Sequence, residues 1–187
     1  MRDRGDHRIF VAVAPPADVG EALFQWARAQ RRTVRGLRPV PADHVHLTLA
    51  FLGERTAREV DAVAAALPEA LARWDDGRGP LRLALGAPAW LPPRRPRALA
   101  VDVHDDDGRL RALHDALAAT LEQAIGWTPE RPLRPHLTAG RMRGEPGRAT
   151  ALDPTPARTF AAQALVLHRS TLGPAGARYE RLAQVAL

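Results

Sequence analysis

Two residue types are missing from this chain of 187 residues: it has no cysteine, and all 27 of its basic residues are arginine rather than lysine. The lack of cysteine excludes disulfides, thiol nucleophiles, thiolate zinc sites and iron–sulfur clusters. Long apolar runs are missing too. The first, from Ile9 to Ala14, is stopped by Pro15 and is too short for a signal peptide, and no run approaches the roughly 20 residues that cross a bilayer. We therefore expect a cytoplasmic protein without membrane contact.

What remains is an ordinary globular composition. Hydrophobic residues make up 45% of the chain and charged residues 26%, which is typical of a folded domain and argues against disorder. The length suits one compact domain. The net charge is +6, and the arginine side chain presents a planar fork that fits pairs of phosphate oxygens. The composition thus favours a polyanionic substrate, and nothing in it requires more than a monomer.

Hydrophobic periodicity predicts alternating strands and helices. Period-two patterns and apolar runs bounded by turn residues indicate strands, and apolar residues at helical spacing indicate helices. Thr56 and Glu59 form a capping-box pattern at the start of one helix, and Asp18 with Glu21 resembles an N-cap pair at the start of another. The predicted strands are 8–14, 45–51, 81–90, 97–104, 136–142, 160–169 and 178–187, and the predicted helices begin near Asp18, at Thr56 and near Asp107.

The order strand, helix, His-x-Thr strand occurs twice in the chain. His46-Leu47-Thr48 and His136-Leu137-Thr138 are 90 residues apart, and the same shift places the first strand and helix on the strand at 97–104 and the helix after it. The sequence therefore predicts a single α+β domain of two lobes related by a pseudo-twofold axis, with approximate repeat halves 8–91 and 97–187.

The two motifs carry the chemistry that the pattern suggests. On a strand, His46 and Thr48 point to one face, and the apolar residues Val45, Leu47, Leu49 and Phe51 point to the other. His136 and Thr138 repeat this arrangement, so the pseudo-twofold axis would turn both pairs toward a single groove. Two imidazoles around one bound group can supply a proton acceptor and a proton donor without metal. Each threonine could donate a hydrogen bond to a phosphate oxygen.

These motifs resemble those of the two-histidine (2H) phosphoesterases, and most closely the RNA 2′,3′-cyclic phosphodiesterases once called 2′-5′ RNA ligases. The resemblance covers nearly the whole chain. Besides the two His-x-Thr motifs it includes the first strand, the extension of the first motif, the Arg-Pro pair before the second motif, and the closing strand pair: residues 8–13, 50–53, 134–135 and 170–179.

The resemblance implies a bilobal α+β fold in which antiparallel sheets line a central water-filled groove and helices lie outside. It also implies an enzyme without metal or other cofactor that opens a terminal 2′,3′-cyclic phosphate of RNA to a 2′-phosphate. In that family the residue matching His46 is the proton donor to the departing 3′ oxygen, and the residue matching His136 is the base that activates water. Thr48 and Thr138 would bind the phosphate.

Other readings of the sequence stay open at this point. The chain could be a relative that acts on 2′-5′ linked oligonucleotides or small cyclic nucleotides, or an idle RNA-binding module. His44 and His46 share a face and could bind a metal, although no third ligand follows the same pattern. Strand parity places Arg141 on the face opposite His136 unless the strand bulges. The cluster from Arg94 to Arg97 suits either an RNA contact or a solvated loop.

Overall fold

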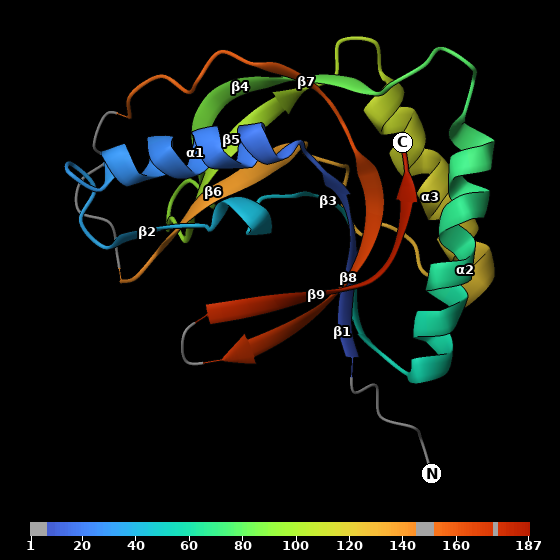
Figure 1. Cartoon of the computed structure of the whole chain (residues 1–187). Helices are drawn as coiled ribbons and strands as arrows, with labels where there is room; N and C mark the ends of the chain where they lie inside the picture. The colour runs from blue at the N-terminus through green and yellow to red at the C-terminus, as the bar shows by residue number, and fades with distance from the viewer. Residues whose placement is uncertain (1–6, 145–151, 174–175) are drawn as a thin grey trace.

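The fold consists of two antiparallel sheets with helices on their outer sides (Figure 1). It is known from a computed structural model, which describes residues 7–144, 152–173 and 176–187. The first sheet has the strand order β3 (Leu47–Arg55), β1 (His7–Ala14), β8 (Ala164–Gly173) and β9 (Gly176–Ala186). The second has the order β2 (Leu37–Pro39), β6 (His136–Met142), β5 (Ala98–His104), β4 (Arg82–Leu91) and β7 (Thr159–Ala161). The predicted α+β class is confirmed.

The helices cover the sheets from outside. α1 (Ala17–Gln30) packs against β2 and β6 of the second sheet and against a short 3-10 helix, η1 (Ala42–His44). α2 (Ala57–Trp74) and α3 (Arg109–Ile125) pack against each other, and α2 also contacts β1, β8 and β9 of the first sheet (Figure 1). One contiguous hydrophobic core includes buried residues of both sheets and all three helices.

Each sheet combines strands from both parts of the sequence. The first sheet pairs β1 with β8, and the second pairs β5 with β4. Because the strands are exchanged in this way, the 8–91 and 97–187 segments interlock rather than forming two separate bodies. The division of the domain into these repeat halves stays a prediction.

Both helices begin where the sequence predicts, but only one of the two predicted N-caps is confirmed. The Thr56 side chain accepts a hydrogen bond from the Glu59 backbone N–H, and the Glu59 carboxylate accepts one from the Thr56 backbone N–H at 2.9 Å, which is a complete capping box. Asp18, in contrast, does not cap α1, because the extended residue before the helix is Pro16. Asp18 lies in the first turn, where its negative charge interacts favourably with the helix dipole. Its carboxylate also forms an ion pair with Arg158 at 3.1 Å.

Both His-x-Thr strands carry a β-bulge at the same place. In the pairing of β1 with β3, Leu49 has no partner because Val11 faces Ala50 and Ala12 faces Thr48. In the pairing of β5 with β6, Ala139 is skipped in the same way. The two bulged residues are 90 positions apart, as the motifs are. A bulge reverses the faces of all later residues, so the prediction that Phe51 lies on the core face is wrong: its side chain is 67% exposed.

The approach to the first motif depends on a close contact at Gly20. This buried glycine of α1 lies directly against the backbone of Ala42, so a Cβ at position 20 would collide with the Ala42 carbonyl oxygen. Since η1 leads directly into His46, the absence of a side chain at position 20 lets α1 hold the segment that presents this histidine.

We expect Gly20→Ala to destabilise the protein by about 1–3 kcal/mol, because a methyl group would be forced against backbone atoms that cannot rotate away. The usual effect in a helix interior has the opposite sign, a stabilisation of up to about 1 kcal/mol. Urea unfolding of the wild type and the variant measures the difference. An increase in the free energy of unfolding would contradict the close contact.

Candidate active site

The two motif histidines are held by the same hydrogen bond. His46 lies between η1 and β3, and its Nδ1 is 2.7 Å from the backbone oxygen of His44. His136 begins β6, and its Nδ1 is 2.8 Å from the backbone oxygen of Arg134. A carbonyl can only accept, so Nδ1 carries the proton in both rings. In the neutral tautomer Nε2 is then free to accept a proton, and in the charged ring it can donate one.

The two motifs approach each other although they belong to different sheets. β3 and β6 are in contact, and Thr48 and His136 line the same open pocket of about 940 Å³. The charge of His136 is close enough to lower the pKa of His46. Thr48 and Thr138 are half-buried. Their hydroxyls have no hydrogen-bond partner in the part of the chain that the structure describes, so both can turn toward a bound group.

An aromatic cluster fixes the ring of His46. The imidazole stacks on Phe10 at 4.9 Å between ring centroids and meets the edge of Tyr179 at 5.2 Å. Phe10 also stacks on His168, at 5.0 Å. Residues of β1, β8 and β9 thus pack around the ring, in addition to its hydrogen bond to His44. Sequence reasoning did not single out Phe10 or His168 as site residues, because each lies on a strand without any motif of its own.

The environment of His46 opposes its positive charge. Burial is the largest cause, and the charges of Arg141, His44 and His136 add to it, so the pKa of His46 falls to about 4 despite the favourable hydrogen bond to the His44 carbonyl. His46 is therefore neutral near pH 7 in the free protein. A bound anion would offset the charge of Arg141 and raise the pKa of His46.

Arg141 joins the site through the bulge at Ala139. Simple strand alternation predicts that Arg141 lies on the face opposite His136 unless the strand bulges. The strand does bulge, at Ala139, so Arg141 lies on the same face as His136. Its side chain is exposed, and its charge reaches His46. The sequence alone does not reveal the bulge, because the bulge is defined by the partner strand.

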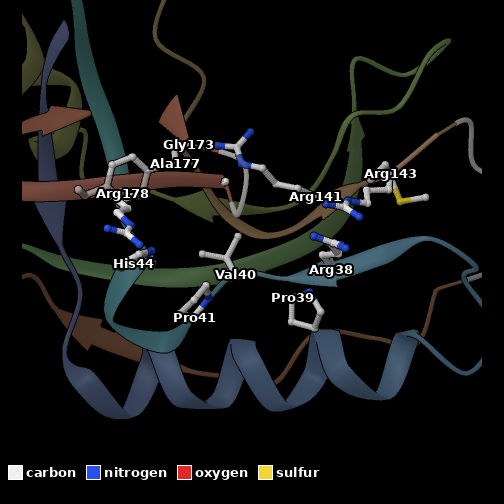
Figure 2. A pocket seen from close by; sticks show the side chains of 13 residues that line it. Arg38, Pro39, Val40, Pro41, His44, Arg141, Arg143, Gly173, Ala177 and Arg178 are labelled. Atoms are coloured by element: carbon white, nitrogen blue, oxygen red, sulfur yellow. The ribbon is translucent and has the colours of Figure 1, made fainter. Parts of the chain in front are cut away.

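Arg141 also lines a second pocket, of about 500 Å³, together with His44 (Figure 2). Tyr179, which packs against the His46 ring, lines this pocket too. This pocket lies between the β2–β6 edge of the second sheet and the tip of the β8–β9 hairpin of the first. Residues from four segments line it: 38–41, His44, 141–143, and Gly173 with 176–179.

The other sequence candidates lie outside this arrangement. Among residues 7–144, 152–173 and 176–187, no group of three or more histidines or carboxylates is placed to hold a metal. The ring of His44 instead packs against the edge of Tyr179 at 5.2 Å. The arginines of the Arg94–Arg97 loop are exposed and line neither pocket. Within the same described residues, no helix is long and apolar enough to cross a membrane.

Comparisons with known proteins agree on one family. Residues 15–174 match the family model described as the 2′-5′ RNA ligase superfamily. A Thermus thermophilus protein named RNA 2′,3′-cyclic phosphodiesterase is 31% identical over 96% of this chain and 90% of its own length. An Escherichia coli protein of the same name is 29% identical over 96% of both chains.

Solved structures show the same fold. The crystal structure of a Thermus thermophilus protein superposes with a TM-score of 0.80 at 32% identity, covering 96% of this chain and 97% of the other. Escherichia coli LigT complexed with 3′-AMP superposes with a TM-score of 0.73 at 27% identity, covering 97% and 98%.

The two half-buried histidines His46 and His168 predict a loss of stability in mild acid. Burial is also the largest cause that lowers the pKa of His168 to about 4, followed by the charges of His46, Arg181 and His44. With a folded pKa below the ordinary 6.5, the unfolded chain binds more protons between pH 6.5 and pH 4. The stability is thus complete above pH 6.5 and falls as the pH drops toward 4.

We expect His168→Phe to lose less stability than the wild type over this range, because phenylalanine keeps the stacking on Phe10 and cannot be protonated. Urea unfolding at a series of pH values between about 4 and 7.5 measures the effect, with the exposed His104 changed to Gln as a matched histidine control. Parallel curves for wild type and His168→Phe would show that His168 does not contribute.

Proposed function

This chain belongs to the 2′-5′ RNA ligase superfamily, and we propose that it hydrolyses the 2′,3′-cyclic phosphate at an RNA end to a 2′-phosphate, with His46 and His136 as the acid–base pair. Its relatives in Thermus thermophilus and Escherichia coli carry the name RNA 2′,3′-cyclic phosphodiesterase. The observation that carries the proposal is the repeated geometry. Both imidazoles donate Nδ1–H to the carbonyl two residues upstream, and both His-x-Thr strands bulge directly after the threonine.

The reaction needs one proton removed and one supplied. Nε2 of His136 accepts a proton from a water molecule as the water oxygen bonds to phosphorus. The bond from phosphorus to the 3′ oxygen breaks, and Nε2 of His46 donates its proton to that oxygen. The product carries a 2′-phosphate and a free 3′-hydroxyl, and exchange with solvent returns both histidines to their starting states.

His46 must gain a proton before it can donate one. In the free protein its pKa of about 4 keeps it neutral near pH 7. A bound phosphodiester anion beside His46 offsets the positive charge of Arg141. It therefore raises the pKa of His46 and favours the imidazolium form. Substrate binding and protonation of His46 are thereby coupled, and the histidine is charged when the leaving oxygen is in place.

The remaining groups stabilise charge on the phosphate. Thr48 and Thr138 donate hydroxyl hydrogen bonds to the non-bridging oxygens from opposite sides, and the guanidinium of Arg141 adds a positive charge. Protons and hydrogen bonds account for every step, so we propose that the reaction needs no metal.

Two other functions are compatible with the same pair of histidines but account for fewer features of the site. A relative of this enzyme could cleave 2′-5′ linked oligonucleotides or small cyclic nucleotides, and turnover of these substrates side by side with a cyclic-ended RNA separates them. An idle RNA-binding module would bind RNA without opening the cyclic end. The Nε2 atoms of both histidines are free to accept or donate a proton, which favours catalysis over binding alone.

We expect His46→Ala and His136→Ala each to lower kcat by about 10²–10⁴-fold, the usual share of a general acid or base. The assay is hydrolysis of a short RNA with a 2′,3′-cyclic phosphate end in EDTA, with the product identified as a 2′-phosphate. Circular dichroism shows whether the variants fold, and His104→Gln is the control. Near-full activity of either alanine variant, or activity that EDTA abolishes, would contradict the proposal.

A further inference from the structure

The first sheet places a further imidazole beside His46. His168 lies on β8, directly across from Phe10 of β1. The rings of His168 and His46 both stack on Phe10, at 5.0 and 4.9 Å between ring centroids. The two imidazoles are themselves only 5.9 Å apart and inclined by 33°. The reaction proposed above uses His46 and assigns no role to His168.

These two rings differ in the hydrogen bonds of their nitrogen atoms. Nδ1 of His46 donates its hydrogen to the His44 carbonyl oxygen at 2.7 Å. Nδ1 of His168 is buried and has no hydrogen-bond partner among the described residues. An imidazolium carries a hydrogen on both nitrogens, and a buried N–H without an acceptor is unfavourable. Of the two neighbouring rings, His46 is therefore the one equipped to carry a positive charge.

The surroundings of this pair of rings do not favour two positive charges. The neighbouring β1 contributes the uncharged ring of Phe10, and β9 contributes the edge of Tyr179, at 5.2 Å from His46 and 6.3 Å from His168. The charged groups that act on one ring or the other are all cationic when charged: His44 of η1, His136 and Arg141 of β6, and Arg181 of β9. A bound anion can thus balance one added proton, whereas a second proton would increase the repulsion.

We propose that His168 is a positioning residue for the proton donor: it packs beside His46 and stays uncharged, so that the one proton taken up with the substrate anion goes to His46. This proposal rests on the proposed function, in which His46 is the donor. The low pKa of His168, about 4, supports it. A neutral neighbour matters because a cation at position 168 would disfavour the imidazolium that donates to the departing oxygen.

Histidine NMR measures directly which ring takes up the proton. The Cε1–H signals of His46 and His168 are followed against pH in sodium sulfate and in sodium chloride of equal ionic strength, and His46→Ala and His168→Phe assign the two signals. We expect His46 to gain its proton at higher pH than His168 in both salts, and sulfate to widen the difference. Protonation of His168 before His46, or of both rings together, would overturn the proposal.

A charge placed at position 168 tests the consequence for catalysis. His168→Arg puts a permanent cation beside His46, and His168→Met is the matched uncharged side chain of similar length. We expect His168→Arg to lower kcat at pH 7 by about tenfold or more and to move the high-pH limb of the kcat profile to lower pH, because the cation disfavours the imidazolium. KM should not rise, since the same cation attracts the substrate anion. A loss of packing alone would affect both variants alike and would leave the limb in place.

The conservative replacement separates the ring from its nitrogen atoms. His168→Phe keeps the stacking on Phe10 and cannot be charged, so its kcat should stay well above that of His168→Arg. Equal kcat for these two variants, or an unshifted high-pH limb in a folded His168→Arg, would overturn the neutral role of His168. No turnover of any cyclic phosphate by the wild type would instead overturn the proposed function, while the NMR titration would still decide which histidine takes up the proton.

Discussion

The hydrogen bond from a histidine Nδ1 to the carbonyl two residues upstream is the constraint on which the site depends. It occurs at His46 and at His136, at 2.7 and 2.8 Å. Because it uses the backbone, it ties the tautomer of each ring to the path of the chain just before the strand. The packing of α1 against η1 at Gly20 therefore helps to set the tautomer of His46. The pairing of β6 with β5 does the same for His136.

Similar backbones around the two histidines do not give them equal environments. His46 is enclosed by Phe10, Tyr179 and His168 and lies near Arg141, and these surroundings oppose its charge. In the free protein this difference favours the neutral ring of His46, so its proposed role as proton donor depends on the substrate anion, which must raise its pKa. The repeated motif supplies the shape of the site, and the packing of the first sheet supplies the asymmetry.

Much of the fold follows from the sequence because its signals are local. Alternating apolar residues predict the strands, and the Thr56–Glu59 pair predicts its helix start. The His-x-Thr repeat predicts which residues meet, and the strands that carry it do come into contact. The bulges at Leu49 and Ala139 could not be predicted, since a bulge is a relation between two strands. The exposure of Phe51 and the placement of Arg141 follow from the bulges, and the low pKa of His46 follows from packing that only the folded chain creates.

The central claim is that His46 and His136 act on opposite sides of one phosphorus atom, as acid and base. The most direct test is a cyclic substrate in which sulfur replaces the departing 3′ oxygen, because a thiolate leaves without a proton. The account predicts that this substrate restores much of the activity of His46→Ala and none of that of His136→Ala. Equal rescue of both variants, or rescue of His136→Ala alone, would contradict it.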